Sequence, residues 1–166
     1  RSSDLGVPEY RFRVAVTGTK GEIVSARAVG VYNAKSKVVL IDVNGRGLNV
    51  RLASVFVSLP RGLELRDGIL HPILGIRLQR TNNRWIASVT GVVSVANATV
   101  AVDGVRVPVT DVRGNVMLIR DQIAVTLLGL FAQTPIRVVG RVSNFQRPKL
   151  DLVISSQAAR FARLVQ

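Results

Sequence analysis

Residues 112–156 have the sequence VRGNVMLIRDQIAVTLLGLFAQTPIRVVGRVSNFQRPKLDLVISS, in which short apolar runs alternate with turn residues. The runs are separated by Arg-Asp-Gln, by Gln-Thr-Pro and by a polar segment that ends at Pro148. β-Branched residues dominate the runs, which favours strands over helices. We therefore expect an antiparallel meander with strands at residues 114–119, 123–132, 136–143 and 150–155.

Alternation along these runs predicts which side chains share a face of the sheet, because successive side chains of a strand point to opposite faces. Val138 and Val142 fall on one face of the third strand, and Arg137 and Arg141 fall on the other. Neighbouring strands must present their apolar side chains to the same face. The predicted apolar wall consists of Val116, Leu118, Val125, Leu127, Phe131, Val138, Val142, Leu150, Leu152 and Ile154.

The same stretch carries a family resemblance. A strand that begins with glycine and an apolar strand that contains glycine precede Ile136-Arg-Val-Val-Gly-Arg-Val142 and Pro148-Lys-Leu-Asp-Leu152. This order resembles the repeating unit of the AsmA/TamB family of long bacterial envelope proteins. Val89-Thr-Gly-Val-Val-Ser-Val95 is similar to a further strand of this kind, so that residues 86–156 match best. The resemblance implies an open, curved, taco-shaped sheet with an apolar concave face.

The resemblance also implies a function. In this family the sheet is a non-enzymatic conduit that carries phospholipid acyl chains between the inner and outer membranes and supports outer-membrane biogenesis. The implied partners are phospholipids, an outer-membrane β-barrel of the Omp85 type and neighbouring repeats of the same chain. The implied location is the periplasm, with an inner-membrane anchor in a segment outside these residues. We therefore expect residues 1–166 to be one β-rich module from a longer repetitive protein.

Composition is consistent with such a module. Apolar residues make up 48% of the chain but aromatic residues only 5%, so aliphatic side chains must supply the burial. The absence of cysteine excludes disulfides and thiolate metal sites. The net charge of +13 favours acidic partners such as nucleic acid, anionic lipid head groups or lipopolysaccharide. The basic residues are dispersed, which is also typical of a solvated sheet face.

The rest of the chain predicts further strands, about ten in all. We expect separate strands at residues 85–89, 91–95, 98–102 and 105–109, and one at 48–59 that ends before Pro60. Pro72 interrupts a run at residues 69–78 and should confine that strand to an edge or a bulge. Helical spacing of Ala158, Phe161, Ala162 and Val165 predicts a short helix at residues 157–166. The predicted fold is thus all-β, an antiparallel meander with a short C-terminal helix.

Catalytic and metal-binding patterns are missing from the sequence. His71 has no ligand or acidic partner at a useful spacing, which favours a surface or packing role. The ten acidic residues are scattered, and no phosphate-binding, dinucleotide-binding or nucleophile motif occurs. We therefore expect no enzyme activity, no cofactor and no metal.

Three functions stay open for the alternating pattern: a lipid groove, a nucleic-acid-binding barrel and a passive structural segment. The strand at residues 123–132 is apolar on both faces, which favours an extended apolar groove or contact with a neighbouring unit over a small closed core. A closed sandwich core fits the alternation equally well. A basic β-barrel that binds nucleic acid would explain the charge, but Tyr10 and Phe12 fall on the face opposite Arg11 and Arg13. A passive β-fibre or adhesin segment is the third possibility.

Overall fold

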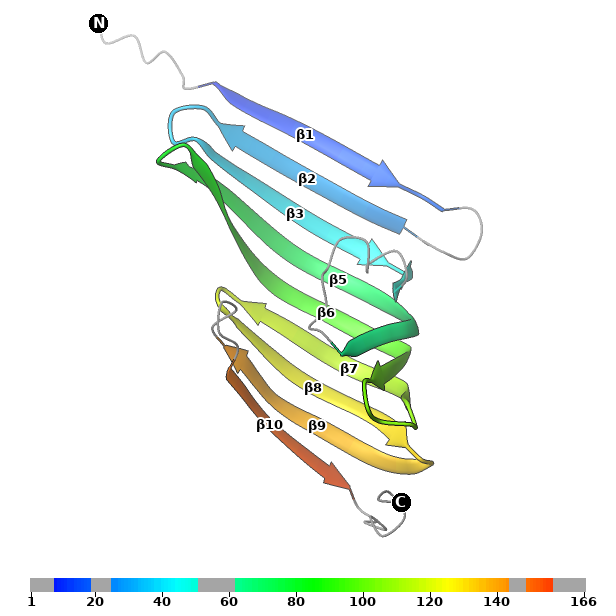
Figure 1. The fold of residues 1–166 in the computed structure, drawn as a ribbon. Helices are drawn as coiled ribbons and strands as arrows, with labels where there is room; N and C mark the ends of the chain where they lie inside the picture. Colours follow the sequence, from blue (N-terminus) through cyan, green and yellow to red (C-terminus); the bar gives the residue numbers. More distant parts are fainter. Residues whose placement is uncertain (1–7, 19–24, 51–61, 144–148, 157–166) are drawn as a thin grey trace, which may run out of the picture.

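The computed structural model describes residues 8–18, 25–50, 62–143 and 149–156, which contain ten strands in one antiparallel sheet (Figure 1). The strands are β1 (Glu9–Val16), β2 (Ser25–Asn33), β3 (Val38–Arg46), β4 (Leu48–Asn49), β5 (Leu63–Thr81), β6 (Arg84–Val102), β7 (Val109–Ile119), β8 (Gln122–Phe131), β9 (Thr134–Ser143) and β10 (Lys149–Ser156). The order in the sheet is β1-β2-β3-β5-β6-β7-β8-β9-β10, and β4 pairs with β5 beside this path. The predicted all-β meander is confirmed. The helix predicted at 157–166 lies outside the described residues.

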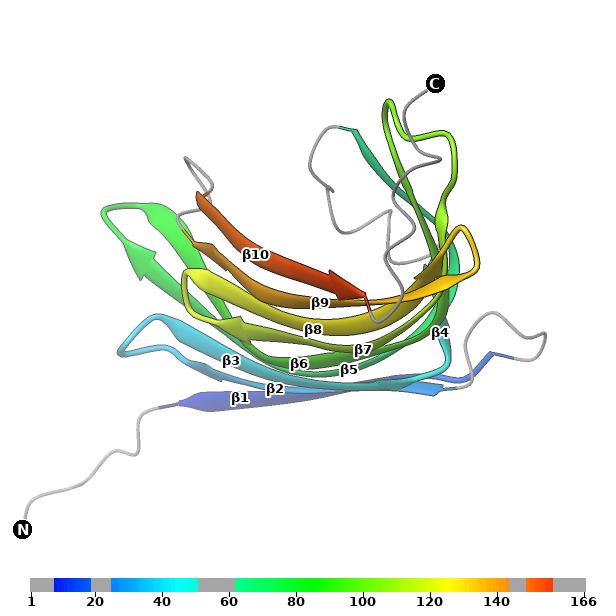
Figure 2. The ribbon, with the colours of Figure 1, turned by 90° about the horizontal axis from the view of Figure 1, so that it is seen from below.

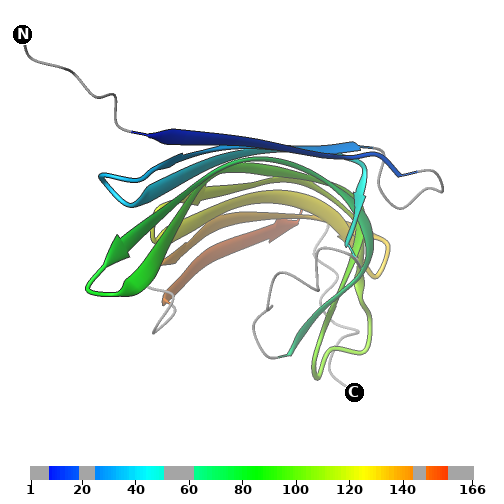
Figure 3. The ribbon, with the colours of Figure 1, turned by 90° about the horizontal axis from the view of Figure 1, so that it is seen from above.

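The sheet is open and curved, as expected. β1 and β10 lie at its two ends, and the sheet does not close on itself. Figures 2 and 3 show that the strands bend in the same sense, so the sheet forms a trough whose long axis crosses the strands. Nine strands side by side at about 4.8 Å per step give this axis a length of about 38 Å.

Glycines allow the strands to bend. Seven of the described glycines share the face of the sheet that carries Val125 and Val138, and these are Gly30, Gly45, Gly68, Gly91, Gly114, Gly129 and Gly140. Gly91 and Gly114 have φ angles of 137° and 142°, which only glycine adopts without strain. A Cβ atom on either residue would collide with a carbonyl oxygen of the neighbouring strand. Glycine kinks are a known source of sheet curvature.

Replacing Gly114 by alanine should therefore destabilise the fold. The Cβ would meet the carbonyl oxygen of Thr126, and we expect the free energy of unfolding to fall by about 2–4 kcal/mol. Gly104→Ala is the matched control, since Gly104 also has a positive φ, of 80°, but nothing lies within 4 Å of its added Cβ. The control should cost only about 1 kcal/mol. Urea unfolding of both variants measures the difference, and equal losses would show that close packing of the strands at Gly114 does not matter.

The boundaries of the central strands differ from those expected. Residues 85–89, 91–95 and 98–102 form one strand, β6, of 19 residues, which pairs along its length with β5, also of 19 residues. Gly91 lies within the strand, and Asn97, with a φ angle of 51°, lies where the register between β6 and β7 shifts. The predicted strand at 105–109 is also wrong, because β7 begins at Val109. These glycine and asparagine residues mark bends and bulges rather than chain reversals.

Pro72 lies inside the sheet and not at an edge. β5 has β3 on one side and β6 on the other, and Pro72 pairs with Val93 of β6. On the other side, pairing with β3 ends at Ile73 and pairing with β4 begins at Leu70. Pro72 thus lies between the residues of β5 that pair with β3 and those that pair with β4, where no backbone N–H donor is required. Of the strand predicted at 48–59, the described residues contain only β4, and residues 51–61 lie outside them.

Candidate functional site

The concave face of the sheet is the candidate site, and we call it the inner face. Bending crowds side chains on the inner side of a sheet and spreads those on the outer side. Along β7, β8 and β9 the positions that share a face with Val125 and Val138 are all half-buried or buried. Most positions on the other face of these strands, such as Asn115, Thr126 and Arg137, are exposed. The face that carries Val125 and Val138 is therefore the inner face.

The strand register shows that this apolar face continues across the sheet from β10 to β1. Val138 lies beside Leu127 and Ile154, and the same alternation continues through β7, β6, β5, β3 and β2 to Phe12 on β1. Large inner side chains outside the predicted wall include Tyr10, Phe12, Val14, Val16, Tyr32, Val39, Ile41, Val43, Leu70, Leu74, Ile76, Leu78, Trp85, Val89, Val93, Val95, Val112, Ile123 and Ile136. Among the described residues of β1–β10 that the register places on this face, Arg80 is the one charged residue, at the end of β5.

The described residues form no second layer over most of this face. Among the described Ala, Val, Ile and Leu side chains only Val50, Ala98 and Val112 are buried, and Val50 and Ala98 meet at Gly68. Elsewhere large inner side chains stay accessible, with 40% of Phe12, 51% of Trp85 and 65% of Ile154 exposed. Apolar side chains that stay accessible on one face of a sheet in this number are uncommon on a soluble monomer and mark an interaction site.

The predicted wall residues share one face. Val116 pairs with Val125, Leu127 with Val138, Leu118 with Ile123, and Leu150 is paired with Val142 through its backbone. Phe131 lies at the end of β8 opposite Thr134, and Leu152 and Ile154 continue the face onto β10. The expectation that these residues share one face agrees with the register, and their role toward a lipid stays a prediction. The alternation alone did not show that the face continues through β6, β5 and β3.

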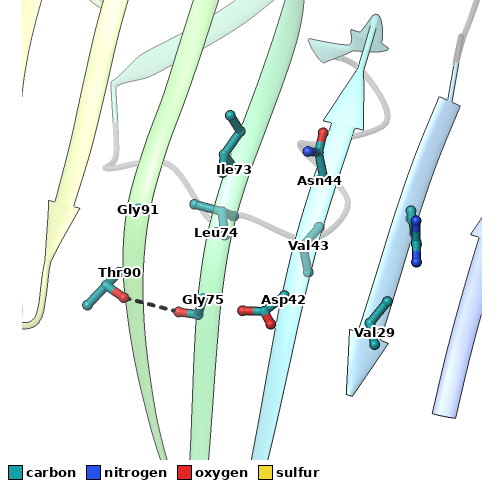
Figure 4. Close-up of a pocket in the computed structure, with 10 residues that line it drawn as sticks. Val29, Asp42, Val43, Asn44, Ile73, Leu74, Gly75, Thr90 and Gly91 are labelled. Atoms are coloured by element: carbon teal, nitrogen blue, oxygen red, sulfur yellow. Dashed lines mark hydrogen bonds between the residues drawn. The ribbon is translucent and has the colours of Figure 1, made fainter. Parts of the chain in front are cut away.

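The outer face carries most of the polar side chains of the sheet, and it also exposes apolar ones such as Ile73, Ile86 and Val153. It carries Arg137 and Arg141 of β9, and Ser94 donates a hydrogen bond of 2.8 Å to Asn115 across β6 and β7. A shallow hollow of about 520 Å³ lies on this face over β2, β3, β5 and β6 (Figure 4). It exists because Gly75 has no side chain between Asp42 and Thr90, its neighbours in the register. The hollow is open, and the described residues around it hold no set of metal ligands.

His71 has a structural contact. Its Nδ1 accepts a hydrogen bond of 3.3 Å from the backbone N–H of Gly47, and the two residues are partly buried. The bond links the connection between β3 and β4 to β5, beside the interruption at Pro72. This agrees with the packing role expected for His71. Within the described ranges, no group of three or more His, Asp or Glu side chains is placed to hold a metal ion.

Comparisons of the chain with protein-family models, curated proteins and solved structures find no match. The resemblance to the AsmA/TamB family therefore stays a prediction. No helix within the described residues has the length and apolar character needed to cross a membrane.

Proposed function

We propose that this chain is a lipid-conduit module, whose inner face carries phospholipid acyl chains between two membranes. The observation that carries the proposal is the inner face itself, which crosses all nine strands of the path and has a charged residue only at one strand end among the described positions. Acyl chains need no directional contacts, and each buried methylene contributes about 0.8 kcal/mol. A continuous apolar surface is therefore sufficient to hold them.

The nucleic-acid interpretation has less support. Single-stranded nucleic acid is bound by exposed aromatic side chains set among basic residues. Tyr10 and Phe12 lie on the inner face with Tyr32 and Gly30, whereas Arg11 and Arg13 lie on the outer face. The basic side chains and the aromatic rings of β1 therefore lie on opposite faces of the sheet.

The open edges fit a longer conduit. β1 and β10 each have one neighbour among the described strands, so one side of each backbone is available for a further strand. Neighbouring repeats could pair there and extend the inner face. We propose the remaining expectations as parts of the same function: a periplasmic location, an inner-membrane anchor outside these residues, and an outer-membrane β-barrel of the Omp85 type as a partner. The proposed role requires no catalysis, cofactor or metal.

Native mass spectrometry of the purified chain after incubation with phospholipid vesicles tests this proposal. We expect bound species whose added mass equals one or more intact phospholipids. Vesicles are the appropriate source because they present lipids at their physiological packing. A chain that stays lipid-free at every vesicle concentration would contradict the proposal.

A further inference from the structure

The two long rims of the trough differ in charge. The turns β2–β3, β5–β6 and β7–β8 lie along one rim, shown at the left of Figure 2. The described turns at this rim and the two outermost residues of each strand that ends there include six basic side chains and two acids, Glu9 and Asp121. The basic side chains are Lys35, Lys37, Arg80, Arg84, Arg120 and Lys149. At the opposite rim the same positions carry Arg46 and Arg106 against Glu64 and Asp103, whose charges cancel. We call the first rim the basic rim.

Two hydrogen bonds fix the position of Arg80 at the basic rim. The backbone N–H of Arg80 donates a hydrogen bond of 3.1 Å to the carbonyl of Lys37, which joins the β2–β3 turn to the β5–β6 hairpin. The Arg80 guanidinium donates to the Asn83 side chain at 2.8 Å and is held against the hairpin tip. Of the two ion pairs found between described side chains, Arg66–Glu64 lies at the opposite rim. Arg11–Glu9 lies at the start of β1, beside this rim, and engages none of the basic side chains named above. The positive charge of the basic rim is therefore available to a ligand.

Aromatic side chains with a polar atom gather at the same rim. The chain has one tryptophan and two tyrosines, and Trp85, Tyr10 and Tyr32 all lie on the inner face beside the basic rim. Tyr10 and Tyr32 stack with ring centroids 6.1 Å apart and an angle of 25° between the planes. Trp85 pairs with Arg80 and is 51% exposed. Such side chains prefer the boundary between hydrocarbon and water.

The order of side chains from the inner face to the basic rim matches the order of groups in a phospholipid. From the middle of the inner face to this rim, aliphatic side chains give way to Tyr and Trp, and then to Lys and Arg. A phospholipid has the same order, from acyl chain through the ester region to phosphate. We infer that lipids lie on the inner face with their phosphates along the basic rim, and that anionic phospholipids are preferred. This inference rests on the proposed function.

Fluorescence of the single tryptophan tests the orientation. Trp85 should be quenched more by phospholipid with a nitroxide on the head group than by phospholipid with a nitroxide near the end of the acyl chain. The paired change Trp85→Phe and Phe131→Trp moves the fluorophore to the opposite rim, at the far end of β8. In that variant the preference for the head-group label should be lost. Equal quenching of Trp85 by both probes, or stronger quenching from the acyl label, would overturn the inference.

Two triple variants with reversed charges test the preference for anionic phospholipids. Native mass spectrometry would compare lipids captured from vesicles with equal amounts of phosphatidylglycerol and phosphatidylcholine. The rim variant carries Lys35→Glu, Lys37→Glu and Arg84→Glu, and the control carries Arg77→Glu, Arg137→Glu and Arg141→Glu on the outer face. We expect the rim variant to lose the preference for phosphatidylglycerol by about a factor of five per residue while total lipid occupancy is kept.

The two experiments separate this inference from the proposed function. If the native chain captures both lipids, but the rim variant and its control behave alike, the proposed function holds and the basic rim has no role. If the native chain captures neither lipid, the proposed function and the inference both fail. A phosphatidylglycerol preference that both triple variants lose equally would show a net-charge effect and overturn the inference.

Discussion

Val138→Asp should nearly abolish phospholipid capture and leave the chain folded. Val138 lies in the middle of β9 on the inner face, between Leu127 and Ile154. A carboxylate placed against acyl chains costs about 3 kcal/mol, which lowers affinity by about a hundredfold. The fold should tolerate the change because Val138 is only half-buried and no second layer of described residues covers it. In a closed core, an unpaired charge would instead unfold the domain.

Val139→Asp is the matched control. Val139 is the same residue type on the same strand, one position away, and faces outward with 36% of its surface exposed. Both variants carry the same charge and the same loss of strand propensity. Any difference between them in folding or lipid binding therefore comes from the face of the sheet on which the aspartate lies. Circular dichroism and native mass spectrometry would measure fold and lipid occupancy. The account is contradicted if Val138→Asp unfolds the chain, or if both variants bind lipid equally.

Removal of bound lipid should lower the stability of the chain. A ligand that binds only the folded state stabilises it by about 2.7 kcal/mol when its concentration is a hundred times its dissociation constant. For a chain of 166 residues, this corresponds to a fall of about 5–10 °C in Tm after delipidation. The effect should be large here because the described residues bury few aliphatic side chains without a ligand. Thermal unfolding followed by circular dichroism, before and after detergent extraction of lipid, measures it.

Adding phospholipid back provides the control for this experiment. Val139→Asp should regain the higher Tm, because its inner face is unchanged, whereas Val138→Asp should stay at the lower value. If lipid remains bound by mass but the Tm does not depend on it, the lipid does not contact the folded inner face. The proposed function would then lose its physical basis.

The strands of the C-terminal half were predictable from local pattern. The strands expected at 123–132 and 136–143 correspond to β8 and β9, which end at Phe131 and Ser143. β9 alternates regularly, and the turn between the two strands, with positive φ at Ala132 and Gln133, is a tight two-residue reversal. Once these two strands pair, the register fixes which side chains share a face. That the predicted wall residues share one face therefore follows from local pattern, and their contact with lipid stays a prediction.

The centre of the sheet could not be predicted in the same way. Glycine and Asn are usual turn residues, so Gly91 and Asn97 suggested that β6 was three strands. Inside β6 the chain continues through both, because β5 supplies a partner of equal length and the bends contribute to curvature. Pairing between strands, rather than the local residue type, decides whether such a residue turns the chain or bends it.

The number of strands also decides which turns share the basic rim. Each chain reversal moves the next turn to the opposite rim, so the position of every turn depends on the number of strands before it. With a full strand counted at residues 48–59, Trp85 falls on the rim opposite Lys37, whereas in the sheet only β3 and β5 separate these two residues along the path. The charged residues were visible in the sequence, but their alignment along one rim comes from the topology.

Site-specific photo-crosslinking along β8 tests the central claim most directly. A benzophenone amino acid would replace, one at a time, the inner residues Ile123, Val125 and Leu127 and the outer residues Ala124, Thr126 and Leu128. Leu128 is an informative control because it is apolar and 46% exposed but faces outward. The account predicts phospholipid adducts at the three inner positions and none at the three outer positions. Adducts that follow exposure or hydrophobicity without this alternation, or that form at Leu128 and not at Leu127, would contradict it.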